Sequence, residues 1–144
     1  MYTGFLHLHN TLRWLLLLTI LITLAKYLSG WFADKPWTKT DNLLGIIFTS
    51  LMDIQLLTGL VLYFFLSPVT KLAFADFGAA MKDSGLRFYA VEHFSLLLIA
   101  VVLVHIGRAK SKKIKIDRRK FKTAAIFFLI ALVIILGAIP WSRV

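Results

Sequence analysis

The stretch RFYAVEHFSLLLIAVVLVHIGR, residues 87–108, decides the fold of this chain. Its part over 88–106 holds about 19 residues, which at about 1.5 Å per helical residue nearly cross a hydrocarbon core of about 30 Å. We therefore predict a membrane-spanning helix here. Glu92, His93 and His105 lie within this helix or at its edge, where ionisable side chains are costly and usually functional.

The residues that follow this helix form the most basic part of the chain. The stretch RAKSKKIKIDRRKFK holds nine lysines or arginines against a single acid, Asp117. A short connection that is this basic stays on the cytoplasmic side of a membrane. We therefore predict a cytoplasmic loop over 107–123, with both termini on the outer side.

Composition assigns the chain to the integral membrane proteins. Its 144 residues are 59% hydrophobic and only 17% charged, and the mean hydropathy is +0.80. The net charge of +10 gathers largely in one loop, which favours contact with lipid headgroups over binding of nucleic acid. The chain has no cysteine, which excludes disulfides, iron-sulfur clusters and covalent c-type haem attachment.

Apolar segments divide the chain into four spans. Arg13 interrupts the first of them, and no basic n-region precedes it, so we expect a retained helix and not a cleaved signal peptide. Thr40, Asp41 and Asn42 are good N-caps for the second span, and the link 69–85 has the pattern of one amphipathic helix on the membrane surface. The prediction is an all-α, four-helix up-and-down bundle forming one transmembrane domain, with spans at about 5–27, 43–66, 88–106 and 124–139.

Histidines on two of these helices fall at matching depth. The first and third spans run in the same direction, which brings His7 and His9 level with His93 near the outer face. Two imidazoles on different helices are the arrangement that ligates the iron of a b-type haem from both sides. His7 and His9 are about 200° apart on a helix, so only one of them can face a given haem. We prefer His9 as the partner of His93, with His7 as the competitor.

One haem b is the economical count. His105 lies at the cytoplasmic end of the third span, where the chain supplies no second histidine, and an interfacial role near lipid phosphates suits it better. Arg87 precedes the third span at the outer face. Its guanidinium suits either a haem propionate or an ordinary position at the membrane interface.

Charges inside the spans require partners. Arg13 and Asp53 fall at similar depth, and a lone charge in the membrane costs at least about 2.5–3.5 kcal/mol on insertion scales. We therefore expect them to pair in a buried polar cluster, with Glu92 as a competitor for Arg13. Such a cluster serves either as a structural ion pair or as a proton path beside a cofactor.

The motifs HLHNTLRW, MDIQLLTG, RFYAVEH and VHIGR together resemble those of small bacterial inner-membrane proteins described as cytochrome b. More distantly the chain is similar to the four-helix cytochrome b561 and superoxide oxidase group, which holds two haems between histidines on several helices. This chain departs from that pattern, because its histidines lie on only two helices and its second span offers Asp53 and Gln55 instead.

The resemblance implies a multi-pass protein of the bacterial inner membrane that takes part in one-electron transfer. A membrane quinol or an outer-face donor would supply the electron, other membrane subunits would be partners, and quinone is a second candidate cofactor. No substrate for an independent enzyme follows from these residues. Two alternatives remain: a haem-free accessory subunit locked by Arg13, Asp53, Glu92 and His93, and a proton or ion conductor built on Asp53, Glu92 and His105.

Overall fold

Four long helices make up most of the molecule. The computed structural model describes residues 1–143, and that part contains no strand. The first three predicted spans lie inside long helical segments, and the fourth extends beyond its segment by one residue, so the prediction of four apolar helices is confirmed. Each segment is long and apolar enough to cross a membrane: Tyr2–Phe32, Lys39–Leu66, Ser84–Lys113 and Asp117–Ala138.

The segments are built from helices joined by π-helical turns. Helix α1 (Tyr2–Phe32) is continuous, whereas α2 (Lys39–Val61) ends in a π-helical turn at Leu62–Leu66. Another π-helical turn, Phe88–Glu92, leads into α6 (His93–Lys113), and α7 (Asp117–Ala138) is regular. A 3₁₀ turn at Trp141–Arg143 follows the last of them.

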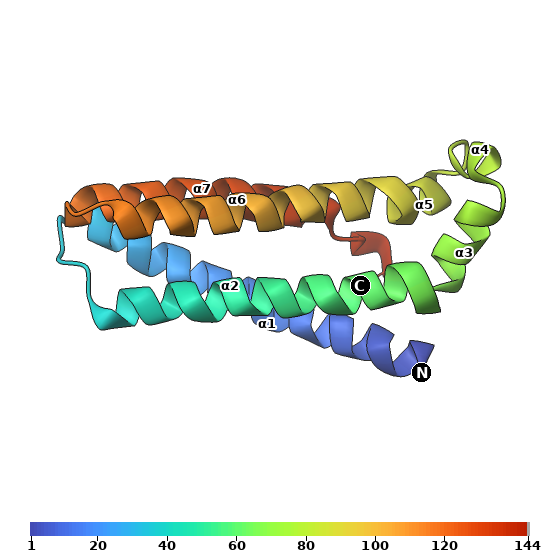
Figure 1. The fold of residues 1–144 in the computed structure, drawn as a ribbon, viewed down its shortest axis with the longest axis horizontal. Coiled ribbons are helices and arrows are strands. Elements are labelled where there is room, and N and C mark those ends of the chain that lie inside the picture. Colours follow the sequence, from blue (N-terminus) through green and yellow to red (C-terminus); the bar gives the residue numbers. More distant parts are fainter. Residues whose placement is uncertain (144) are drawn as a thin grey trace.

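Helices α6 and α7 lie side by side as an antiparallel hairpin (Figure 1). Gly107 on α6 lies directly against Phe127 on α7, and a Cβ at Gly107 would overlap the Cβ of Phe127. Small residues allow such close approach of two helices. The hairpin is the tightest pairing of helices in the described part of the chain.

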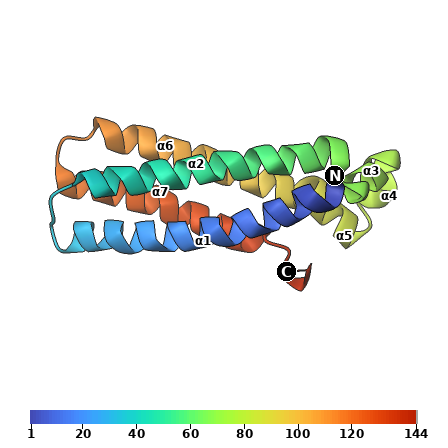
Figure 2. The same cartoon turned by 90° about the horizontal axis from the view of Figure 1, so that it is seen from below.

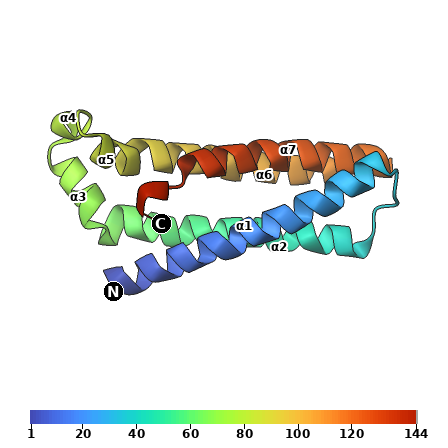
Figure 3. The same cartoon turned by 180° about the vertical axis from the view of Figure 1, so that it is seen from behind.

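Helix α1 is inclined to the other helices. The N-terminal end of α1 lies beside α2, and its C-terminal end reaches α7 (Figure 3). Figure 2 shows the same inclination of α1 from below. Aromatic contacts hold the C-terminal half of α1, where the Tyr27 ring lies 6.0 Å from that of Phe121 and 5.8 Å from that of Phe128. The N-terminal half of α1, which carries the histidines, is therefore less tightly enclosed.

The core and the outer faces are both apolar. Side chains such as Ile20, Phe48 and Phe128 are almost fully buried between the helices. Large apolar side chains also cover the outside, with Leu18 56% and Val133 64% exposed. Apolar surface this extensive is rare on water-soluble monomers and is compatible with contact to membrane lipids.

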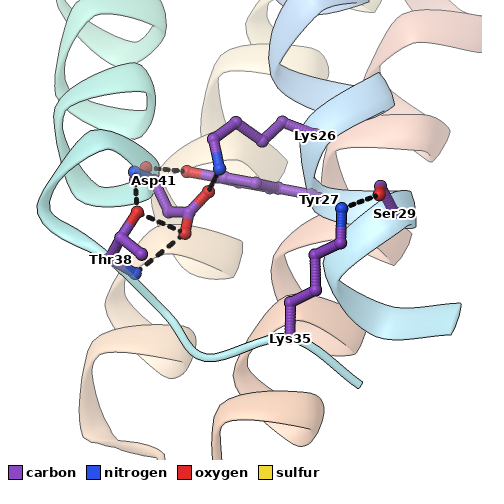
Figure 4. Close-up of polar contacts among 6 residues, drawn as sticks. All are labelled: Lys26, Tyr27, Ser29, Lys35, Thr38 and Asp41. Atoms are coloured by element: carbon purple, nitrogen blue, oxygen red, sulfur yellow. Dashed lines mark hydrogen bonds and ion pairs between the residues drawn. The ribbon is translucent and has the colours of Figure 1, made fainter. Parts of the chain in front are cut away.

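The turn between α1 and α2 is fixed by one buried carboxylate (Figure 4). Asp41 accepts hydrogen bonds from the Thr38 backbone N–H and hydroxyl, and its other oxygen lies 2.8 Å from Lys26 Nζ. Tyr27 donates its hydroxyl to the Asp41 carbonyl. The N-cap is therefore Thr38, which precedes the predicted candidates Thr40, Asp41 and Asn42, because Asp41 at the third helical position completes a capping box with it.

The basic stretch is largely helical, so the prediction of a loop over 107–123 is wrong in extent. Helix α6 runs on to Lys113 and α7 begins at Asp117, which leaves only 114–116 between them. Lysine and arginine are good helix formers and favour helix C-termini, whereas aspartate favours an N-terminus. The charges therefore extend the helices beyond the apolar spans.

The predicted amphipathic helix over 69–85 is divided into short pieces. Helices α3 (Pro68–Ala75), α4 (Phe77–Ala80) and α5 (Ser84–Arg87) replace it. Asp76 accepts a hydrogen bond from the N–H of Ala79, and Asp83 accepts from those of Gly85 and Leu86. Each aspartate caps a new helix and so ends the one before it.

Candidate functional site

The structure brings His9 on α1 next to His93 on α6. Their ring centroids lie 6.4 Å apart and their planes make an angle of 73°. His7 is exposed on the outside of α1. Of the two candidates on the first helix, it is therefore His9 that faces His93.

The end of α7 orients the ring of His93. The His93 Nδ1 atom lies 2.7 Å from the carbonyl oxygen of Ala138, the last residue of that helix. Pro140 cannot continue a helix, so this carbonyl is free to accept a bond from outside it. A carbonyl only accepts, so Nδ1 carries the hydrogen and Nε2 of the neutral ring carries a lone pair.

Helix α2 orients the ring of His9 in the same way. The His9 Nδ1 atom lies 3.1 Å from Thr58 Oγ1, and the Thr58 hydroxyl donates to the carbonyl of Gln55 at 3.0 Å. With its hydrogen engaged there, Oγ1 accepts from His9 Nδ1–H, which again leaves the lone pair on Nε2. Gln55 adds a hydrogen bond from its Nε2 to the His9 carbonyl at 2.9 Å, which ties α1 to α2 at this level.

Two π-helical turns lie beside the histidines. The turn Phe88–Glu92 immediately precedes His93, and Tyr63 in the turn Leu62–Leu66 donates its hydroxyl to the carbonyl of Ala90. The Tyr63 ring also stacks on Phe94, with centroids 4.4 Å apart. Turns of this kind are rare and recur at functional sites, since the extra residue rotates the side chains that follow it.

Both histidines line a cavity of about 290 Å³ between α1, α2, α6 and the end of α7. Arg13, Asn10 and Gln55 contribute its polar wall. An apolar cavity with a few convergent polar groups is the usual form of a cofactor or ligand site. Most of the remaining lining is apolar and includes Leu16, Met52, Leu56, Leu97, Val101 and Ile135.

Arg13 reaches this cavity without an acidic partner. Its Nε atom is buried and makes no hydrogen bond within the described residues, and its guanidinium carbon lies 5.1 Å from the Trp14 ring. The Oε1 atom of Gln55 is likewise buried and unbonded there. The cavity wall thus offers both a cationic donor and an amide acceptor.

The predicted cluster of Arg13, Asp53 and Glu92 is wrong. Asp53 Oδ1 lies 2.6 Å from His105 Nε2, on the face shared by α2 and α6. Glu92 pairs with Arg87 at 2.7 Å on the exposed surface. Asp53 and Glu92 thus meet partners other than Arg13.

Arg87 and His105 therefore have other neighbours than the sequence suggested. Arg87 is engaged by Glu92 and by the carbonyl of Met81, and it does not line the cavity. The predicted interfacial His105 instead contacts a carboxylate. The alternative of an ion conductor keeps only this contact between His105 and Asp53, because Glu92 is paired elsewhere.

Two groups that orient the histidines were missed in the sequence. Thr58 follows Gln55 by three residues, so the two share one face of a helix, and this spacing was the available signal. The other is the Ala138 carbonyl, for which Pro140 two residues later signals a helix end with free acceptors. Neither signal identifies which helix lies opposite.

The chain matches no protein-family model, no curated protein and no solved structure. Its class therefore rests on the molecule itself. Fold and composition define a four-helix protein with the features of a multi-pass membrane protein. Its candidate site is the cavity that His9 and His93 share.

Proposed function

We propose that this protein is a b-type cytochrome-like subunit of the bacterial inner membrane that binds one haem b and takes part in one-electron transfer. His9 and His93 would hold its iron. Haem, when bound, supplies a single centre that takes up and gives back one electron. The resemblance of the sequence motifs to small bacterial cytochromes b agrees with this assignment.

The observation that carries the proposal is the contact that each imidazole makes through Nδ1. Thr58 Oγ1 lies 3.1 Å from His9 Nδ1, and the Ala138 carbonyl oxygen lies 2.7 Å from His93 Nδ1. With a hydrogen on each Nδ1, both Nε2 lone pairs are left for a ligand. Two such rings have no hydrogen to share, so they cannot hydrogen-bond to each other through Nε2. Histidines that ligate a metal are held by their second nitrogen in this manner.

The spacing of the rings fits one iron. Metal–imidazole bonds of about 2.0–2.1 Å put two opposed ring centroids roughly 6 Å apart, and the observed separation is 6.4 Å. The cavity of about 290 Å³ lies at the lower end of the ~300–1,000 Å³ typical of ligand sites. Accommodating a whole porphyrin therefore requires the helices around the cavity to separate slightly, and the loosely enclosed N-terminal half of α1 is suited to this.

The depth of the site in the membrane bears on its role in electron transfer. The basic ends of α6 and α7 favour the cytoplasm, which puts the histidines near the outer face and both termini outside. A single haem near one face is a relay and leaves most of about 30 Å of membrane uncrossed. The electron then comes from a membrane quinol or an outer-face donor, and other membrane subunits act as partners.

The experiment that tests the proposal is a dithionite-reduced minus oxidised visible spectrum. The protein is expressed with added haem and purified in detergent as the wild type and as the variants His9→Ala, His93→Ala and His7→Ala. The expected result is a b-type α band with one haem per chain. This band is lost or strongly reduced in His9→Ala and His93→Ala. His7→Ala is the matched control, because its exposed side chain lies on the same helix and outside the cavity.

The opposite results are equally clear. A folded, colourless wild-type protein that co-purifies with other membrane subunits would refute haem binding by this chain and favour the accessory-subunit alternative. Loss of haem in His7→Ala with retention in His9→Ala would overturn the assigned ligand.

A further inference from the structure

Arg13 is a cation in the wall of the cavity, and no acidic side chain pairs with it within residues 1–143. We propose that Arg13 binds a carboxylate of the ligand in this cavity, which under the proposed function is a propionate of the haem. This inference rests on the proposed function and assigns Arg13 a role in holding the cofactor that the sequence had suggested for Arg87.

The acids of the chain are all accounted for elsewhere. Three of the seven pair with other basic side chains: Asp41 with Lys26, Asp53 with His105 and Glu92 with Arg87. The remaining acids lie at helix ends: Asp34 after α1, Asp76 and Asp83 as caps of α4 and α5, and Asp117 as the first residue of α7. None of these seven acidic side chains therefore pairs with Arg13 within residues 1–143.

The surroundings of Arg13 favour an anionic ligand. A charged group in an apolar setting is costly unless it is paired, and Arg13 Nε is buried without a hydrogen bond within residues 1–143. The Trp14 face at 5.1 Å offers only partial stabilisation of the cation. A guanidinium is well suited to a carboxylate, which it binds through two parallel hydrogen bonds.

The position of Arg13 relative to the proposed iron ligand agrees with this role. Arg13 follows His9 by four residues, so it lies one turn along the same face of α1. Both line the cavity together with His93. A group held by His9 at its centre can thus present its edge to Arg13.

A comparison of two ligands tests the inference without any substitution. The full-length apoprotein in detergent is titrated with ferric protohaem IX and with its dimethyl ester, in which both carboxylates are blocked, and the Soret absorbance is followed. Hydrogen bonds to charged groups are among the stronger ones, so we expect the ester to bind about tenfold or more weakly.

Variants then identify Arg13 as the partner. We expect Arg13→Gln to weaken binding of protohaem IX about tenfold and to leave binding of the ester unchanged, because the lost interaction is absent with the ester. Arg13→Lys keeps the charge and should recover part of the affinity. Arg87→Gln is the matched control and should bind both ligands as the wild type does, since Glu92 already occupies this arginine.

The failures are distinguishable. If the wild type binds neither ligand, the proposed function and the inference fall together. If it binds both ligands equally well, or if Arg13→Gln weakens both by the same factor, haem binding stands but Arg13 has no carboxylate partner. Loss of affinity for protohaem IX in Arg87→Gln alone would transfer the role to Arg87.

Discussion

Asp53 Oδ1 and His105 Nε2 lie 2.6 Å apart on the exterior of the bundle, and 48% of each side chain is exposed. An ion pair of this exposure in water contributes about 0–1 kcal/mol. In lipid, removing one partner leaves the other without compensation, which costs at least about 2.5–3.5 kcal/mol for a charged group on insertion scales. The energetics of this pair therefore report whether the face lies in a membrane.

We predict that His105→Ala destabilises the protein in lipid nanodiscs more than Asp53→Asn does. The first variant leaves the Asp53 carboxylate without a partner, whereas the second keeps an amide that can still hydrogen-bond to the His105 ring. Thermal unfolding followed by circular dichroism measures the difference. Lys35→Ala, which removes only an exposed bond to Ser29, is the control. Equal effects below about 0.5 kcal/mol for all three variants would argue against a lipid-facing pair.

The close contact of α6 with α7 gives a second prediction. Gly107→Ala places a methyl group on the Cβ of Phe127, an atom that cannot rotate away, so the helices must separate. Overpacking of this kind costs about 1–3 kcal/mol. Gly137→Ala is the matched control, because no atom lies within 4 Å of its Cβ and alanine favours the helix. Unfolding temperatures of the two variants should shift in opposite directions, and a stable Gly107→Ala would contradict the observed packing.

The capping box at the start of α2 gives a third prediction. Thr38→Ala removes the cap and one hydrogen bond to the buried Asp41, and should lower the free energy of unfolding by about 0.5–2 kcal/mol. Thr40→Ala, two residues on and exposed, should change it by less than about 0.5 kcal/mol. Denaturation in detergent compares them. A larger effect of Thr40→Ala would restore the cap predicted from sequence.

The contact of Gly59 with His9 gives a fourth prediction. A Cβ at Gly59 would lie 3.2 Å from His9 Cε1, so Gly59→Ala must push the imidazole by a few tenths of an ångström. We expect the affinity of the Gly59→Ala variant for haem to fall several-fold, up to about tenfold, with its helix content unchanged. Gly4→Ala on the same helix as His9 meets no atom within 4 Å and should bind haem normally. Wild-type affinity in Gly59→Ala would show that the ring is not fixed at this contact.

How much of this could be predicted from the sequence depends on what each signal measures. Hydropathy measures the length of the spans, and it located all four helices. It underestimated their ends, because the charged residues up to Lys113 and from Asp117 favour helix as well as water. Asp76 and Asp83 are of a residue type that favours N-caps and so signal the interruption of the link, although its apolar residues also follow a helical pattern.

The sequence predicted how far along its helix each residue of the candidate site lies. It did not predict which side of the helix the residue is on. Counting residues from the helix starts placed His9 and His93 at one level, and the structure brings them together. The same count paired Arg13 with Asp53, yet Asp53 faces α6 and meets His105. Which side of a helix faces which neighbour follows from the packing of all four helices, including the inclination of α1. No local pattern in the sequence encodes it.

The most direct test of the central claim is the low-temperature electron paramagnetic resonance spectrum of the oxidised, haem-loaded protein. Two imidazoles on one iron give a low-spin ferric signal. If the ring planes keep the angle of 73° when the helices separate to admit the haem, that signal is strongly anisotropic, with one large g value. The account predicts that signal in the wild type and its loss in His93→Ala. A high-spin signal in the wild type, or a folded wild-type protein that takes up no haem, would contradict it.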